Sequence, residues 1–133
     1  MNKKLHIEGV MTAFPHSIGI DQNLSLAKKM MREHGVRHLP VQDGGKLVGI
    51  LSHRDINFAL ALDKKEPEEV IVEDAFTVEP YIVNRDADLS MVASHMAQNR
   101  LGCALVIDGE KLVGIFTATD ACRTLAALLR NEI

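Results

Sequence analysis

Two short segments of the chain place a hydroxyl residue three positions before an aspartate. They are Ser52-His-Arg-Asp55 and Thr117-Ala-Thr-Asp120. A helix that begins directly after a strand presents free backbone N–H groups and the positive end of its dipole to an anion. The hydroxyl adds a donor there, and the acid one turn on can accept from both hydroxyls of a ribose, as in dinucleotide folds. Each segment is therefore a candidate site for a phosphorylated sugar, with the sugar at the carboxylate.

The same spacing also has a purely structural interpretation. Ser-x-x-Asp and Thr-x-x-Asp are near-matches to a capping box, in which the hydroxyl is the N-cap and the acid is residue N3. Asp55 and Asp120 would then stabilise helix starts and nothing more. The protein would be an interaction module that dimerises and binds no nucleotide. The two roles can coexist in one side chain.

The two segments belong to a tandem repeat. Asp43-Gly-Gly-Lys-Leu-Val-Gly-Ile50 returns 65 positions later as Asp108-Gly-Glu-Lys-Leu-Val-Gly-Ile115, and Thr12 meets Thr77 at the same offset. Such self-similarity predicts two copies of one structural unit. We expect the first unit over residues 1–62, a polar linker over 63–69 and the second unit over 70–133.

Each copy predicts the element order strand, helix, strand, strand, helix. Asn23 and Asp88 precede apolar stripes at helical spacing, and Asp-Gly turns separate short apolar runs that suit strands. A second helix follows Ser52 or Thr117. A unit of about 60 residues buries too little surface to be stable alone. The predicted fold class is therefore α/β, with two β-α-β-β-α units packed through their sheets with pseudo-twofold symmetry.

Composition and motifs exclude several classes of function. The net charge of −3, with one Tyr and no Trp, argues against nucleic-acid binding. No apolar run approaches the ~20 residues of a membrane helix and no signal peptide is evident, so we expect a cytoplasmic protein that does not bind membranes. Two cysteines, Cys103 and Cys122, fit a reduced compartment.

Catalysis and metal binding find no support in the pattern of residues. His34 and His38 are four apart, but no His-Glu-x-x-His pattern is present and Gly35 should end the helix between them. Cys103 has no obvious base for a nucleophilic mechanism. No glycine-rich phosphate loop with its lysine is present. We therefore expect no catalytic residue, no metal site and no enzymatic activity.

The order and spacing of several motifs resemble the cystathionine-β-synthase (CBS) domain, which normally occurs as a tandem pair called a Bateman module. The resemblance runs from about Val10 to Leu128. It depends on Val10-Met-Thr12, Leu39-Pro-Val41, Leu47-Val-Gly-Ile50 and the pattern Gly-x-x-[Ser/Thr]-x-x-Asp at Gly49 and Gly114. It implies a stand-alone regulatory module. The ligands implied are AMP, ADP, ATP, S-adenosylmethionine or NAD, bound in clefts between the two units, with Mg²⁺ only if a nucleotide carries it and no catalytic cofactor.

The resemblance also implies roles for individual residues. Asp55 and Asp120 would contact ribose, and aliphatic or aromatic residues near the first strand of each unit would contact adenine. The phosphate residues implied are Ser52, Arg54, Thr117, Thr119, Arg37 and His38, and the adenine residues are Phe14, His16, Ile18, Tyr81 and Val83. Core packing is the alternative for Phe14 and Tyr81. Gly102 and Cys103 stand where the first copy has Arg37 and His38, so we expect two unequal sites.

Partners follow from the same resemblance. Modules of this family usually form flat dimers through helices next to the clefts, so a homodimer is expected. The helical residues that would form the dimer contact include Phe58, Leu62, Leu128 and Leu129. Because no part of the 133 residues is left to act as an effector, a regulatory role also implies an unidentified effector protein.

Overall fold

A computed structural model describes residues 4–133 of the chain. These residues form two compact units. The central unit consists of His16–Pro80, and the terminal unit consists of residues 4–15 together with Tyr81–Ile133. No helix in the described part of the chain has the length and apolar character needed to span a bilayer.

The central unit contains a four-stranded sheet with the strand order β2-β3-β4-β5. β2 is parallel to β3, and the other neighbours are antiparallel. Its helices are α1 and α2, and two 3₁₀ turns, η2 and η3, follow them. In chain order the elements are β2 (Ile18–Gly19), α1 (Leu24–His34), β3 (His38–Asp43), β4 (Lys46–Ser52), α2 (His53–Asp63), η2 (Pro67–Glu69), η3 (Val72–Asp74) and β5 (Thr77–Val78).

The terminal unit repeats this design with the strand order β1-β8-β7-β6. β6 is parallel to β7, while β1 and β7 are antiparallel to β8. In chain order the elements are η1 (Ile7–Gly9), β1 (Thr12–Ala13), β6 (Ile82–Asn84), α3 (Leu89–Asn99), β7 (Cys103–Asp108), β8 (Lys111–Thr117) and α4 (Ala118–Leu129). The predicted α/β class and the order of elements in both copies are thus confirmed.

One strand in each sheet comes from the other sequence repeat. β1 precedes the first repeat's β2 in the chain but pairs with β8, at Thr12↔Ile115 and Ala13↔Gly114. β5 precedes the second repeat's β6 but pairs with β4, at Thr77↔Ile50 and Val78↔Gly49. The chain therefore passes from one compact unit to the other after Pro15 and again after Pro80, and not at the borders of the repeats. Residues 63–69 were expected to form a linker. They contain Asp63, the last residue of α2, and the whole of η2.

The helix starts follow from local sequence. The Asn23 side chain accepts a hydrogen bond from the Leu26 N–H over 2.9 Å at the start of α1. Asp88 accepts from the Ser90 N–H over 2.9 Å at the start of α3. These contacts satisfy backbone donors that no helical carbonyl can reach.

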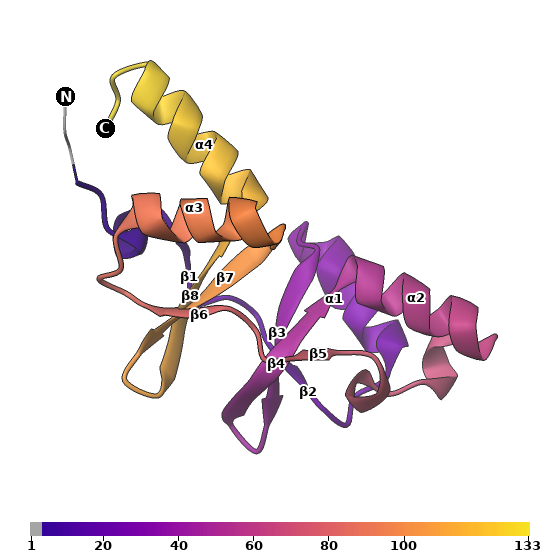
Figure 1. Ribbon diagram of the computed structural model, residues 1–133. Coiled ribbons are helices and arrows are strands. Elements are labelled where there is room, and N and C mark those ends of the chain that lie inside the picture. The colour runs from indigo at the N-terminus through magenta and orange to yellow at the C-terminus, as the bar shows by residue number, and fades with distance from the viewer. Residues whose placement is uncertain (1–3) are drawn as a thin grey trace. The chain divides into compact units, whose positions relative to one another are not determined.

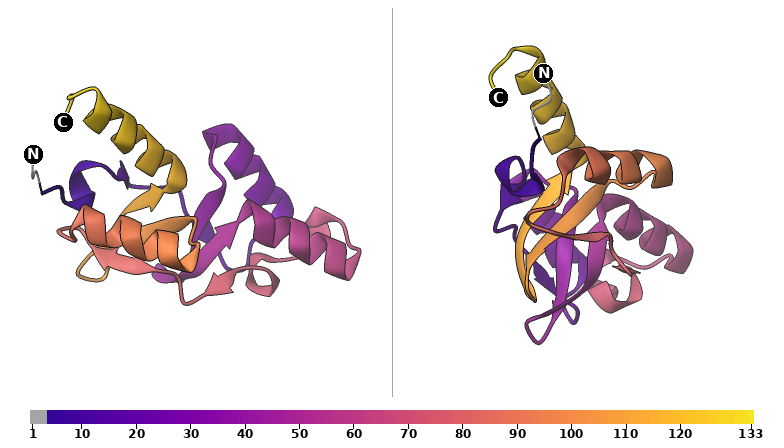
Figure 2. Two further views of the ribbon diagram at one scale, coloured as in Figure 1. Left: turned by 45° about the horizontal axis from the view of Figure 1, so that its top comes forward. Right: turned by 60° about the vertical axis from the view of Figure 1, so that its left-hand side comes forward.

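Each unit has its own hydrophobic core, to which its sheet and its helices contribute (Figure 1 and Figure 2). In the central unit Leu24 and Ile56 of the helices meet Val41 of β3. In the terminal unit Val92 of α3 meets Val106 and Phe116 of the sheet.

Candidate functional site

The start of α2 is a complete capping box. The Asp55 N–H donates to Ser52 Oγ over 3.0 Å, and the Ser52 N–H donates to Asp55 Oδ2 over 2.9 Å. Ser52 itself is extended, and the helix begins at the next residue. The capping box predicted from this motif is therefore present in the central unit.

The start of α4 has the same arrangement. The Asp120 N–H donates to Thr117 Oγ1 over 3.3 Å, and the Thr117 N–H donates to Asp120 Oδ2 over 2.9 Å. The Thr117 hydroxyl also lies 3.1 Å from Asp120 Oδ2. Because a capping box uses only part of the acceptor capacity of a carboxylate, it does not by itself exclude a second role for either acid.

Both aspartates also contact a threonine on the strand that comes from the other repeat. Thr12 Oγ1 on β1 donates to Asp120 Oδ1 over 3.0 Å. Thr77 Oγ1 on β5 lies 3.3 Å from each carboxylate oxygen of Asp55. Neither threonine was expected at the site from the sequence. The one sequence feature that marks them is that both repeats have a threonine at this position. A two-residue strand is too short to show a pattern that predicts its pairing.

The glycine of each motif makes room for that strand. A Cβ atom on Gly49 would overlap the Thr77 carbonyl oxygen and the Phe76 ring. A Cβ atom on Gly114 would overlap the Met11 side chain. The first residue of Gly-x-x-[Ser/Thr]-x-x-Asp is therefore required by packing, whereas its hydroxyl and acid lie at the helix start.

The two aspartates differ in their surroundings. Arg123 Nη1 donates to Asp120 Oδ1 over 2.8 Å, and the Asp120 residue is only 3% exposed. Phe58 occupies the position equivalent to Arg123 in the first repeat, and it is 68% exposed. Asp55 is half-buried and forms no ion pair in the described part of the chain. Arg123 was not expected at the site, because it has no counterpart in the first copy.

The expected phosphate residues of the first copy gather at one end of the central sheet. His38 begins β3 and pairs with Ser52 at the end of β4. The His53 N–H donates to the Arg37 carbonyl oxygen over 2.9 Å, which ties Arg37 to the start of α2. Arg37 and Arg54 are exposed, and neither forms an ion pair within residues 4–133. Two cations and one hydroxyl thus lie around the start of this helix.

The charge state of His38 depends on competing effects. Burial lowers the pKa of its imidazole below the ordinary value, the nearby Asp55 carboxylate opposes this shift, and the Arg37 guanidinium adds to it. The neutral form is therefore favoured in the folded protein. His38 can donate one N–H to an anion in that form, but it supplies little positive charge near pH 7.

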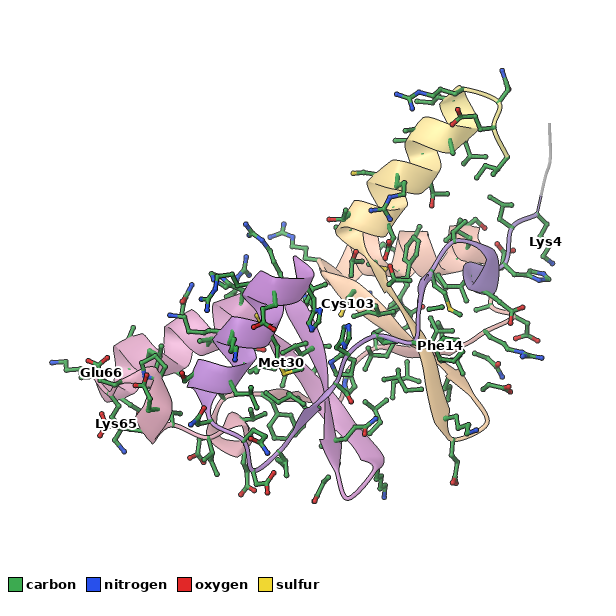
Figure 3. The ribbon with its side chains drawn as sticks, turned by 180° about the vertical axis from the view of Figure 1, so that it is seen from behind. Lys4, Phe14, Met30, Lys65, Glu66 and Cys103 are labelled. Carbon is green, nitrogen blue, oxygen red and sulfur yellow. The ribbon has the colours of Figure 1, made fainter. Side chains whose placement is uncertain are left out.

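The terminal unit has a different set of side chains at the corresponding positions. Cys103 begins β7 opposite Thr117 and is buried, and its pKa is raised to about 12 by that burial (Figure 3). Gly102 contributes only its carbonyl, which accepts from the Ala118 N–H over 3.2 Å. Thr119 is exposed at the first turn of α4. Neither Gly102 nor Cys103 provides a cation.

The residues expected near adenine fall into two groups. Phe14, Tyr81 and Val83 lie in the terminal unit, whereas His16 and Ile18 lie in the central unit. Phe14 directly follows β1, adopts a left-handed φ of 49° and is 79% exposed (Figure 3). The core-packing alternative is wrong for Phe14. Its repeat equivalent, Glu79, is also left-handed, with φ of 61°.

Three of the remaining residues of this group are at least partly buried. Tyr81 packs beside the terminal core, with its ring centroid 4.3 Å from that of His95, and Val83 is half-buried. Ile18 is 3% exposed in the central core, so only its backbone is left for a ligand. The His16 ring stacks on His34 at 3.6 Å. Across residues 4–133, no group of three or more His, Cys, Asp or Glu side chains could hold a metal ion.

Comparison with known proteins agrees with the repeat and the fold. The family model described as CBS domain matches residues 7–62 and again residues 72–127. L-aspartate semialdehyde sulfurtransferase of Methanocaldococcus jannaschii is 37% identical over 105 residues, which is 76% of this chain. The chain spans only 20% of the length of that relative.

Solved structures match over nearly the whole chain. A provisionally assigned acetoin utilization protein (AcuB) from Vibrio cholerae superposes with a TM-score of 0.87 at 29% identity, covering 98% of this chain and 96% of the other. The CBS domain pair of protein MJ0100, solved with 5′-methylthioadenosine and S-adenosyl-L-methionine, superposes with a TM-score of 0.82 at 27% identity. That match covers 94% of this chain and 98% of the other. With two matched repeats and this fold, the chain belongs to the CBS domain family and is a CBS pair, a regulatory type of module.

Proposed function

We propose that this chain binds adenosine-containing ligands at the starts of α2 and α4 and acts as a sensor without catalytic activity. The observation that carries the proposal is the hydroxyl N-cap paired with an aspartate at both helix starts. The backbone N–H groups and the hydroxyl suit a phosphate, and the carboxylate suits the two hydroxyls of a ribose. The MJ0100 pair, which was solved with two adenosyl ligands, supports this choice of ligand class.

The central unit is the better candidate for a phosphorylated ligand. Arg37 and Arg54 are exposed near Ser52 and have no carboxylate partner in the described part of the chain. A protein with a net charge of −3 needs local cations of this kind to bind a polyanion. AMP, ADP and ATP are therefore proposed for the set Arg37, His38, Ser52, Arg54 and Asp55, with Mg²⁺ only as a companion of the nucleotide.

Exposed apolar side chains on the second helix of each unit support a role in assembly. Phe58 and Leu62 on α2 are 68% and 69% exposed, and Leu129 on α4 is 75% exposed. Such residues are typical of interaction surfaces when they gather on one helix. We propose that the protein forms a homodimer through these helices and passes the ligand signal to an effector protein.

Thermal unfolding with a ligand panel tests the proposal. The panel is AMP, ADP, ATP with and without Mg²⁺, S-adenosylmethionine and NAD, with guanosine nucleotides as controls. A ligand at about 100 times its dissociation constant stabilises the fold by about 2.7 kcal/mol. For a chain of this length the midpoint should rise by about 10 °C. We expect at least one adenosine-containing ligand, and no guanosine nucleotide, to produce such a shift.

Variants separate ligand binding from helix capping. Asp55→Ala removes a helix cap and the proposed ribose contact, whereas Asn23→Ala removes only the cap of α1 in the same unit. Each change should lower stability by about 1 kcal/mol. Only Asp55→Ala should also abolish the rise in unfolding midpoint that a ligand bound to the central unit produces. Asp120→Ala and Asp88→Ala form the matching pair in the terminal unit.

The second candidate function is an interaction module that binds no nucleotide. The completed capping boxes favour it, because they give both aspartates a structural reason to be present. A protein that melts cooperatively but shows no shift with any adenosine-containing ligand would support this alternative and contradict the sensor.

A further inference from the structure

The Asp120 carboxylate already accepts as many hydrogen bonds as it can. Oδ1 accepts from Thr12 Oγ1 over 3.0 Å and from Arg123 Nη1 over 2.8 Å. Oδ2 accepts from the Thr117 N–H over 2.9 Å and from the Thr117 hydroxyl over 3.1 Å. An ionised carboxylate offers about four lone-pair positions. A ribose can therefore bind Asp120 only by displacing one of these donors.

Asp55 has acceptor capacity left. The Ser52 N–H donates to its Oδ2 over 2.9 Å, and the single Thr77 hydroxyl is shared at 3.3 Å between both oxygens. Phe58 stands where Arg123 would be, and Asp55 forms no ion pair within residues 4–133. Asp120 thus has two donors that Asp55 lacks, the Arg123 guanidinium and the Thr117 hydroxyl.

Arg123 is the donor of Asp120 that can leave at the lowest cost. Its side chain is 69% exposed and lies one turn along α4 from Asp120. Because the Arg123 side chain is exposed, water can hydrate its guanidinium after it leaves Asp120. Thr117, by contrast, is held by the backbone of the capping box, and Thr12 is held by the pairing of β1 with β8.

We propose that Arg123 is an internal competitor for the Asp120 carboxylate and makes the terminal position the weaker of two adenosyl sites, so that the central position fills first. This inference depends on the proposed function, because the competitor acts on the ribose contact. It assigns part of the inequality of the two ribose contacts to Arg123, which stands in place of Phe58.

Adenosine is the probe for the test, because it has the ribose but no phosphate that Arg123 could bind. Titration calorimetry of an Asp55→Ala background isolates the terminal position. Adding Arg123→Ala should tighten adenosine binding about two- to fivefold, the range that an exposed ion pair can contribute. Arg130→Ala is the matched control, since it removes the same charge from the C-terminal end of α4 and should leave the affinity unchanged.

The reciprocal change tests the central position. Phe58→Arg places a guanidinium three residues after Asp55, as Arg123 follows Asp120. In an Asp120→Ala background it should weaken adenosine binding by a similar factor. Thermal unfolding of each variant without ligand checks that the fold is retained.

The outcomes separate the two proposals. Adenosine affinity that is unchanged or lower in the Arg123→Ala protein would overturn the competitor role. If Arg123→Ala weakens the binding of AMP and leaves the binding of adenosine unchanged, the competitor role is also overturned. Arg123 would then be a phosphate ligand. If neither AMP nor adenosine binds to any of the folded proteins, the proposed function itself fails, and the inference fails with it.

Discussion

Thr12 donates its hydroxyl proton to Asp120 Oδ1 over 3.0 Å, although the two residues lie 108 positions apart. The contact exists because β1, which belongs to the first sequence repeat, pairs with β8 of the second repeat. Thr77 makes the equivalent contact with Asp55 in the central unit, over 3.3 Å. The carboxylate proposed to contact ligand in each unit is therefore linked to a strand of the other sequence repeat.

The contact between Thr12 and Asp120 should contribute measurably to stability. Thr12→Val removes a donor from a carboxylate that is 3% exposed, and we expect a loss of about 1 kcal/mol in the free energy of unfolding. Thr77→Val should cost less, because its hydrogen bond is longer and Asp55 is half-buried. Urea unfolding of the two variants checks the order. An equal or reversed order would contradict the importance of the shorter contact.

The two motif glycines should differ in their tolerance of alanine. The Cβ atom in Gly49→Ala would overlap a backbone carbonyl and an aromatic ring, neither of which can move without disturbing β5. The Cβ atom in Gly114→Ala would overlap the flexible Met11 side chain. We expect a cost of about 1–3 kcal/mol for Gly49→Ala and a smaller cost for Gly114→Ala. Denaturant midpoints at a constant m-value measure both costs.

The two cysteines should react at different rates in the folded protein. Cys122 is exposed on α4, whereas Cys103 is buried and burial raises its pKa to about 12. Because the thiolate is the reactive form, iodoacetamide at pH 8 should label Cys122 and spare Cys103 until the protein unfolds. Mass spectrometry of tryptic peptides distinguishes the two sites. Rapid labelling of Cys103 in native buffer would show that β7 opens readily.

Stability should fall as the pH drops below the ordinary pKa of histidine. Burial lowers the pKa of His38 from 6.5 in the folded protein, so the unfolded chain binds the proton more readily. The contribution of His38 to the free energy of unfolding is complete above pH 6.5 and decreases as the pH falls toward the lowered pKa.

His38→Gln isolates this effect from the other titrating groups. The variant should unfold with a weaker dependence on pH between 7.5 and 5.5 than the unchanged protein. Chemical denaturation at several pH values in this window measures the slope. A slope that the substitution leaves unchanged would mean that another group carries the dependence.

Local patterns predicted much of the fold and of the candidate site. The capping residues Asn23, Ser52 and Thr117 and the apolar stripes predicted the helices, because these features act within one turn of the chain. The repeat predicted that both copies would fold alike. The pairing of β1 with β8 could not be predicted, since two-residue strands carry no periodicity and the contact depends on tertiary packing.

Exposure was the property that sequence predicted least well. Core packing was the alternative to an adenine contact for Phe14, but this residue follows β1 with a left-handed backbone and is 79% exposed. Ile18 was expected near a ligand, but its side chain fills the central core. Arg123 was not identified, because its role follows from its distance to Asp120 and no motif includes it.

Backbone NMR during a titration with AMP is the most direct test of where a ligand binds. We predict that the amide signals of Ser52, His53, Arg54 and Asp55 shift with a saturable dependence on AMP. The signals of Asn23 to Leu26, at the capped start of α1 in the same unit, should not shift. Saturable shifts confined to other segments, or no shifts at millimolar AMP in a folded sample, would contradict the proposal that the start of α2 is a nucleotide site.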